Sequence, residues 1–311
     1  MLDVAACVQV MPPQTRRDMV LLVGGTGQLG GRIARELLSR GVKVRALCRN
    51  GSGYGALRRM GADIAIGDLK DPESLSNACA GADIVMTTAN SGRRGGDDTV
   101  DTVDVAGSRA LIDAARQAGV VRFIYTSVWG ATAESPVPFI RAKAGSEAYL
   151  KASGMAWTIL APNAFMESWP GMVVGAPAAA GRDVVVVGEG RRRHAFVAEH
   201  DVAQFATAAV MNDATRNRHL PIGGPAAHSW LDVVQIYEEA LGRAIAVRHV
   251  EPGTRVDGVP DALLALLAGL DTFDSDFDSS ALASALGVMQ TPLAAWVRAS
   301  LATLRGRSAR L

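Results

Sequence analysis

The 311-residue chain has a formal net charge of +1 at pH 7, so no overall field directs it to nucleic acid or to an acidic membrane surface. Hydrophobic residues make up 49 % of the chain, enough for one large or two modest domains, and no apolar run reaches the roughly 18 residues of a membrane span. The odd, unevenly spread cysteines Cys7, Cys48 and Cys79 offer no disulfide framework and no metal-ligand spacing, which favours a cytoplasmic protein without a metal site.

Residues 1–18 precede the first predicted strand and are treated as an N-terminal extension. They lack a basic leading region, and their apolar part stops at Pro12 and Pro13, a pattern that argues against a signal peptide. We expect this extension to be disordered and the first domain to begin at Met19.

Residues 19–31 are typical of a strand, a glycine turn and the start of a helix, which together open a dinucleotide-binding βαβ unit. The turn reads GGTGQLG at 24–30. Gly24 allows the tight turn, Gly27 lets the backbone approach a pyrophosphate, and Gly30 lets the helix lie close to the strand. The phosphates would then face the amides of the helix N-terminus. The alternative is a glycine turn that only joins the strand to the helix.

The second predicted strand, residues 42–49, ends in the sequence CRN at 48–50. A carboxylate at this place would accept a hydrogen bond from the ribose 2′-hydroxyl of NAD, whereas a basic residue would pair with the 2′-phosphate of NADP. Arg49 stands here, which favours NADP(H) over NAD(H). The alternative is a solvated arginine at a strand end.

Strands and helices continue to alternate up to residue 162, with strands predicted at 62–68, 82–89, 120–128 and 155–160, and helices at 54–60, 72–80, 97–119 and 139–153. This alternation predicts an α/β fold, a doubly wound parallel (Rossmann) sheet over 19–162. Small polar side chains follow the strand ends, at the edge where a cofactor is expected.

The alternation breaks after residue 163, and residues 163–311 are predicted to form a smaller C-terminal α+β subdomain that serves as substrate domain or lid. Parts of 183–223 are expected to return to the Rossmann sheet. Residues 171–181 are rich in Gly and Ala and predict a loop or lid. Asp201 is predicted to be the N-cap of a helix. The run at 191–194, RRRH, is interpreted as a solvated turn, with a grip on an anionic substrate as the alternative.

Several motifs in order carry a family resemblance: GGTGQLG at 24–30, CRN at 48–50, GDL at 67–69, YTS at 125–127, KAGSE at 143–147, SGMAWTILAPNAFME at 153–167 and EHDVA at 199–203. The chain resembles the NmrA-like branch of the atypical short-chain dehydrogenases/reductases. Within that branch it is similar to NAD(P)H:quinone oxidoreductase-type and isoflavone-reductase-type proteins. The resemblance covers nearly all of 19–300, and its cofactor motifs are more specific than its substrate region.

The resemblance implies a role for each matching residue. Arg49 would hold the 2′-phosphate, Asp68 and Leu69 would flank the adenine, and Lys143 would reach the nicotinamide ribose. The stretch from Thr87 to Asn90 would lie along the ribose and pyrophosphate. The full set of implied cofactor contacts is Gly24, Thr26, Gly27, Gln28, Leu29, Gly30, Arg49, Asp68, Leu69, Thr87, Thr88, Asn90, Lys143, Pro162 and Phe165.

Ser127 and Lys143 are the catalytic candidates, because the wider superfamily uses Ser, Tyr and Lys with the Tyr four positions before the Lys. Phe139 stands at that Tyr position, so the proton-donating phenol is absent. Lys143 could donate the proton if burial and a nearby cationic nicotinamide lower its pKa. Its alternative role is structural, binding ribose hydroxyls without proton transfer. Quinone reduction is less demanding, because the reduced quinone can take protons from water.

We therefore expect an NADP(H)-binding oxidoreductase that transfers hydride to a quinone or a conjugated carbonyl, with no nucleic-acid or membrane partner and with a homodimer as its assembly. The first alternative is a non-catalytic regulatory protein that senses NADP(H), a reading that Phe139 favours. A weaker alternative is a sugar-nucleotide epimerase or dehydratase, since such enzymes of this fold rely on the missing Tyr.

Overall fold

The computed structural model describes residues 18–92, 95–257, 259 and 261–308, so the predicted extension lies outside the described residues except for Asp18. The chain divides into two compact units. The first consists of the described residues up to Pro162 together with Val202–Pro221 and Leu282–Val288. The second consists of Asn163–Asp201, Ile222–Ala281 and the described residues from Met289 onward. Leu282–Val288 thus belongs to the first unit, although it falls within the predicted second domain.

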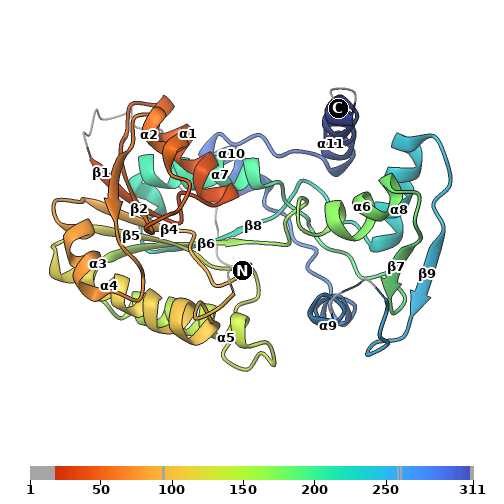
Figure 1. The fold of residues 1–311 in the computed structure, drawn as a ribbon, viewed down its shortest axis with the longest axis horizontal. Coiled ribbons are helices and arrows are strands. Elements are labelled where there is room, and N and C mark those ends of the chain that lie inside the picture. Colours follow the sequence, from red (N-terminus) through yellow and green to blue (C-terminus); the bar gives the residue numbers. More distant parts are fainter. Residues whose placement is uncertain (1–17, 93–94, 258, 260, 309–311) are drawn as a thin grey trace. The chain divides into compact units, whose positions relative to one another are not determined.

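The first unit is built on a seven-stranded sheet with the order β3-β2-β1-β4-β5-β6-β8 (Figure 1). The pairs from β3 to β6 are all parallel. This confirms the predicted doubly wound parallel sheet. The strands are β1 (Met19–Val23), β2 (Lys43–Cys48), β3 (Asp63–Ile66), β4 (Ile84–Thr87), β5 (Arg122–Thr126), β6 (Ala156–Pro162) and β8 (Arg218–Ile222).

Helices connect these strands, and one of them departs from the prediction. The predicted helix at 97–119 begins at Val100 and changes its winding, because its first eight residues form the π-helix η1 (Val100–Gly107) before α4 (Ser108–Gln117) continues as an α-helix. Thr99 caps its start by accepting a hydrogen bond from the Thr102 amide. The other helices are α1 (Gln28–Ser39), α2 (Gly55–Arg59), α3 (Pro72–Cys79), α5 (Pro138–Lys151), α7 (Glu199–Met211), η3 (Asp213–Thr215) and α10 (Ser280–Leu286).

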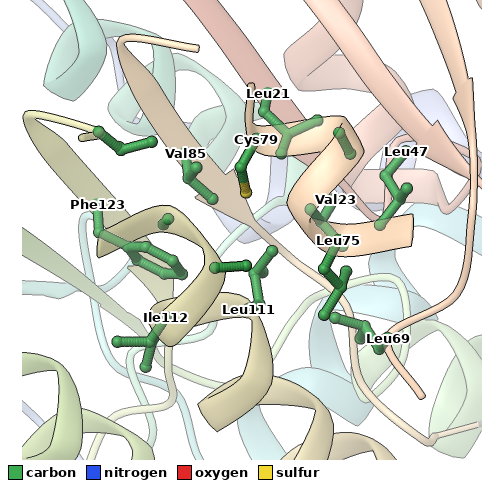
Figure 2. Packing of buried hydrophobic residues seen from close by; sticks show 14 of the residues in the cluster. Leu21, Val23, Leu47, Leu69, Leu75, Cys79, Val85, Leu111, Ile112 and Phe123 are labelled. Atoms are coloured by element: carbon green, nitrogen blue, oxygen red, sulfur yellow. The ribbon is translucent and has the colours of Figure 1, made fainter. Parts of the chain in front are cut away.

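An apolar core fills the space between the sheet and the helices α3 and α4 (Figure 2). Alternate strand residues point into it, since successive strand side chains face opposite sides of a sheet. Each fully buried aliphatic or aromatic side chain contributes about 1.5–3 kcal/mol, so this layer fixes the strand ends on which the site depends. The labelled members are Leu21, Val23, Leu47, Leu69, Leu75, Cys79, Val85, Leu111, Ile112 and Phe123.

A fully buried arginine joins β5 to the segment that precedes β8. The Arg122 guanidinium donates to the hydroxyl oxygens of Thr158, at 2.8 Å, and of Thr215. The Asn212 carbonyl accepts at 3.5 Å, and the Asp213 carboxylate lies 3.9 Å away. Burial lowers the pKa of Arg122 to about 10, so the guanidinium is still charged at neutral pH. This network holds the segment from 212 to 215 against the sheet.

The second unit contains a two-stranded parallel sheet, β7 (Val184–Val187) with β9 (Val247–Val250). Within the predicted return segment 183–223, therefore, β8 joins the large sheet but β7 does not. The loop predicted at 171–181 is wrong, because η2 (Pro170–Gly175) and α6 (Ala176–Ala179) are helical. Gly175 packs under the Tyr237 ring, where a Cβ would collide with the phenol. The remaining helices are α8 (Trp230–Leu241), α9 (Asp261–Leu270) and α11 (Leu293–Ser308).

Asp201 does not cap a helix, because α7 already begins at Glu199. The buried Asp201 carboxylate instead accepts two hydrogen bonds of 2.7 Å, from the backbone amide and the hydroxyl of Thr291. It thereby anchors the segment that leads into α11. The reason for the wrong prediction is that this partner lies 90 positions away in the sequence.

The arginines of the RRRH run pair with acids of their own unit. Arg192 lies 3.1 Å from Asp274, and Arg193 lies 3.2 Å from Asp232. These pairs favour the interpretation of residues 191–194 as a turn.

Among the described residues, no helix is both long and apolar enough to cross a membrane.

The fourth residue of the run, His194, is fully buried in the second unit. Its Nδ1 lies 2.7 Å from the Ser275 hydroxyl, and its Nε2 lies 3.1 Å from the Leu270 carbonyl oxygen. Burial lowers its pKa, so the imidazole is neutral and donates from Nε2 to that carbonyl. His194 therefore fastens the segment after α9 to the strand-like stretch before α7.

Candidate functional site

The glycine turn lies at the carboxyl edge of the first unit's sheet, between β1 and β4, where the strand order reverses. Ligands of doubly wound sheets bind at such a switch point. Gly24 has φ +93°, and a Cβ there would collide with the Thr88 hydroxyl and the Ala89 amide. A Cβ at Gly30 would overlap the Gly24 carbonyl group. Both glycines are therefore required for the turn itself, whatever binds there.

Gly27 is not required for the turn in this way. It is the N-cap of α1, and the position that a Cβ would occupy is largely open. A Cβ there would meet only the Gly24 carbonyl oxygen, at 3.3 Å. Thr26 and Gln28 beside it are exposed, Leu29 is half-buried, and no side chain caps the α1 amides. The turn thus leaves the first-turn amides open to an anion, and these residues fit a pyrophosphate.

A cavity of about 600 Å³ lies at the carboxyl ends of β2 and β3, at the same edge of the sheet as the glycine turn. Arg49–Ser52 line one side, and Ile66–Asp68 line the other. The Asp68 amide donates to the Ser74 hydroxyl at 3.1 Å, which fixes the GDL segment on the start of α3. Leu69 is buried beneath and belongs to the core (Figure 2). The cavity lies where the resemblance expects the adenosine end of the cofactor.

Arg49 extends from the end of β2 to the Asp98 carboxylate, with 2.7 Å between Nη1 and Oδ2. Lys70 donates to the other carboxylate oxygen of Asp98. Arg49 remains 46 % exposed, so part of its guanidinium still faces solvent. The structure thus brings Arg49 to the predicted pocket and pairs it with Asp98, which also binds Lys70. The sequence reasoning did not predict these partners.

The segment after β4 is held mainly by its own hydrogen bonds. The Thr87 hydroxyl accepts from the Ala89 amide at 3.2 Å. The Asn90 side chain donates to the Thr88 carbonyl at 3.4 Å and accepts from the Gly92 amide at 2.9 Å. Thr87 and Asn90 therefore shape the loop, and the Thr88 hydroxyl lies against the glycine turn, 3.5 Å from the Gly24 carbonyl.

Lys143 on α5 is 3 % exposed and enclosed by aromatic rings. Its ammonium donates to the Thr126 carbonyl oxygen at 3.1 Å, at the end of β5. It also lies 4.9 Å from the ring centre of Tyr125 and 5.3 Å from that of Phe139. A cation over the face of an aromatic ring is attracted by the negative charge of that face. The position of the missing phenol thus holds a ring that stabilises the ammonium instead of sharing a proton with it.

Ser127 follows β5 and its hydroxyl donates to the Glu147 carboxylate, with 2.6 Å between the oxygens. Glu147 lies one helical turn after Lys143 on α5. Burial raises its pKa, but hydrogen bonds from His219 and Ser127 outweigh that effect and hold the pKa below its usual value. The Lys151 ammonium, 3.4 Å from a Glu147 carboxylate oxygen, also lowers the pKa. The carboxylate is ionised at neutral pH and keeps the Ser127 proton directed toward itself.

Two predicted contacts lie at the end of β6. Pro162 is buried and its carbonyl accepts from the Trp129 amide at 2.9 Å. Phe165 belongs to the second unit, where its backbone pairs with Val197.

Glu147 is a further residue that the sequence reasoning missed, although its place in KAGSE, four residues after Lys143, put it on the same helix face.

Two curated proteins illustrate what the chain resembles in sequence. The chain is 32 % identical over 231 residues to the photosystem II assembly factor Ycf39 of Cyanophora paradoxa, covering 74 % of this chain and 71 % of that protein. It is 30 % identical over 250 residues to the NAD(P)H azoreductase of Xenophilus azovorans, covering 79 % of this chain and 83 % of the relative.

Two solved structures share the fold. The NADPH-dependent quinone oxidoreductase QOR2 of Escherichia coli, complexed with NADPH, superposes with a TM-score of 0.77 at 24 % identity, over 91 % of this chain and all of that one. The triphenylmethane reductase of Citrobacter sp., complexed with NADP(H), gives 0.77 at 23 % identity, over 90 % and 99 % of the two chains. Both likenesses support the predicted NmrA-like architecture.

A family model described as NAD(P)H-binding matches residues 24–213, from the first glycine of the turn to the segment held by Arg122. The predicted nicotinamide dinucleotide is thereby confirmed as the ligand class. Given this match, the glycine turn and the cavity at the same edge of the sheet, the chain belongs to the NAD(P)H-binding protein family.

Proposed function

We propose that the chain is an NADP(H)-dependent oxidoreductase that delivers hydride to a quinone or a similarly electron-poor acceptor. The observation that carries this proposal is that two of the three superfamily catalytic positions lack an available proton donor: Phe139 replaces the phenol, and the Ser127 proton is directed to Glu147. An acceptor that takes its proton from water does not need such a group.

Three groups are involved. Phe139 cannot donate a proton. The Ser127 proton is held by the ionised Glu147 carboxylate at 2.6 Å. The Lys143 ammonium donates one of its N–H groups to the Thr126 carbonyl and lies against two aromatic rings.

NADPH supplies a hydride when it is bound. A quinone that accepts the hydride becomes a hydroquinone monoanion, which takes one proton from water, so that NADPH, quinone and H⁺ give NADP⁺ and hydroquinone. Lys143 would hold the ribose next to the nicotinamide with its two remaining N–H donors. Ser127, whose proton is directed to Glu147, would present oxygen lone pairs and accept a hydrogen bond. A fixed ammonium near the reacting atoms also favours the negative charge that develops on the acceptor.

The 2′-phosphate would be held by Arg49, whose exposed guanidinium lines the cavity. The fold neighbours include an NADPH-dependent quinone oxidoreductase and a triphenylmethane dye reductase, and a 30 % identical relative is an azoreductase. All three names describe reductases of conjugated acceptors, which supports the assignment. Homodimer formation and a cytoplasmic location stay predictions.

The test is NADPH oxidation followed by absorbance with a panel of quinones and a parallel panel of aldehydes and ketones. We expect turnover with quinones and none with simple carbonyls. The variant Phe139→Tyr places a phenol four residues before Lys143 and should add carbonyl reduction. Turnover of carbonyls by the wild type, with quinones inert, would contradict the proposal.

A regulatory protein that senses NADP(H) is the second candidate, because a relative at 32 % identity is an assembly factor and the superfamily's phenol is absent. In that case NADPH would raise the melting temperature through binding linkage, yet no acceptor would be reduced. An epimerase is disfavoured by Phe139, since epimerases of this fold rely on the Tyr at that position.

A further inference from the structure

Arg49, which lines the adenosine cavity, belongs to a compact cluster of charged residues drawn from three separate segments. Arg49 follows β2, Lys70 follows β3, and Asp98 precedes η1. Both carboxylate oxygens of Asp98 are used, Oδ2 by Arg49 at 2.7 Å and Oδ1 by Lys70. The Asp98 side chain is 5 % exposed, whereas those of Arg49 and Lys70 are 46 % and 35 % exposed. A buried anion thus lies beneath two cations that face solvent.

Asp68 adds a fourth charged side chain to this cluster. Asp68 lies 3.9 Å from the Lys70 ammonium and its carboxylate accepts from the Lys70 amide at 2.9 Å. The four side chains therefore contribute two positive and two negative charges. The hydrogen bond to Asp98 raises the pKa of Lys70, so its ammonium stays charged over the whole physiological range. A phosphate that approaches Arg49 meets a cation already paired with an acid.

The two cofactors differ only in the group on the adenosine ribose, and the cluster contains chemistry for each. A carboxylate accepts a hydrogen bond from the 2′-hydroxyl of NAD, and arginine or lysine pairs with the 2′-phosphate of NADP. The acid that NAD-binding sites usually carry at the end of β2 is absent there, and Asp98 brings one to the same place from another part of the chain.

We propose that Asp98 sets the balance between NADP(H) and NAD(H), serving as the internal anion that competes with the 2′-phosphate for Arg49 and Lys70 and as the acceptor for the 2′-hydroxyl of NAD(H). This inference rests on the proposed role of Arg49. Lys70 is the second phosphate ligand. The wild-type chain therefore accepts both cofactors, because the charge that would attract the phosphate is largely neutralised from within.

The decisive experiment is calorimetric titration of the full chain with NADPH and NADH, and with 2′,5′-ADP and 5′-AMP as probes of the adenosine end. Asp98→Asn removes the competing charge and keeps the side-chain size. We expect it to tighten NADPH about tenfold and to leave NADH unchanged or weaker, so that the preference for NADPH rises at least about tenfold.

The matched control is Asp97→Asn, because Asp97 is the exposed neighbour and its change shifts the net charge equally. It should leave the preference unaltered. Lys70→Met provides an independent test and should lower the NADPH preference about tenfold, with NADH unaffected. Melting curves of each variant report whether it is folded.

An unchanged preference in Asp98→Asn, or a shift toward NADH, would overturn the inference, because Asp98 would then only hold Arg49 in place for the phosphate. Equal changes of the NADPH preference in Asp97→Asn and Asp98→Asn would also overturn the inference, because the loss of one negative charge would then explain both. These titrations need no electron acceptor. Failure of the proposed reductase activity would therefore appear as absent turnover, with the binding preferences intact.

Discussion

Replacing Lys143 by Met separates cofactor binding from proton donation. The Lys143 ammonium has three N–H donors and the Thr126 carbonyl takes one at 3.1 Å, which leaves two for ribose hydroxyls. A hydrogen bond that involves a charged group contributes about 1.5–3 kcal/mol. Loss of the ammonium should therefore weaken NADPH binding roughly ten- to hundredfold.

The fold should survive this substitution. Methionine keeps an unbranched side chain between the Tyr125 and Phe139 rings, where sulfur–aromatic contacts of about 0.3–1.5 kcal/mol replace cation–π contacts of up to about 2 kcal/mol. Removal of a buried charge offsets part of that loss. We expect the free energy of unfolding to change by about 1 kcal/mol or less.

The kinetic readout is kcat at saturating NADPH. With water as the proton source, kcat for a quinone should stay within a few-fold of wild type in Lys143→Met, while KM for NADPH rises. A general acid would lose roughly 10²–10⁴-fold in kcat. The control is Lys43→Met, because Lys43 is exposed at the opposite end of the sheet, at the start of β2. A 10²-fold fall in kcat for quinones would refute the reasoning and identify Lys143 as the proton donor.

Three further outcomes follow from the structure. Gly27→Val should abolish NADPH binding in calorimetry with little change in melting temperature, because the valine side chain would project into the open space at the start of α1. If the variant kept its affinity for NADPH, the pyrophosphate would not bind at this turn. As the pH falls below about 6.5, the unfolded chain should take up a proton before His194 does, because burial lowers the folded pKa; stability should fall by up to about 1.4 kcal/mol per pH unit, with a flatter profile in His194→Gln. Asp201→Ala should lower the free energy of unfolding, measured in urea, by about 1.5–3 kcal/mol, because the Thr291 amide and hydroxyl lose their acceptor. A change below about 0.5 kcal/mol would show that this anchor is dispensable.

The sequence predicts best those features whose cause is local. The turn at Gly24 is predictable because its positive φ and its close approach to Thr88 are demands that glycine alone meets. The parallel sheet follows from the alternation of elements. The cofactor class follows from both, since a glycine turn between such a strand and helix has one common use.

Features that depend on partners far apart in the sequence could not be predicted from it. Asp98 is 49 positions from Arg49, and only the parallel sheet brings them together. Asp201 suits an N-cap by type, yet its partner Thr291 decides its role. The π-helical conformation of η1 could not be predicted either, because the apolar spacing of residues 100–107 does not distinguish a π-helix from an α-helix.

Composition misled the interpretation at residues 171–181. Gly and Ala favour a loop when nothing else is known, but the small residue at Gly175 serves a close approach to Tyr237. Ser127 shows the complementary limit. Its position in the sequence predicts a catalytic role, whereas the direction of its proton depends on Glu147, 20 positions away.

The way the chain crosses between its two units limits how it can be cut or recombined. The cofactor-binding unit is assembled from three stretches of sequence, so a fragment ending at Pro162 would lack all of α7 and β8. Strand β6 would become an unprotected sheet edge, the kind of surface that templates aggregation. The Arg122 guanidinium would at the same moment lose its partners at Asn212 and Thr215. A separately expressed first unit would therefore also need the later stretches 202–221 and 282–288.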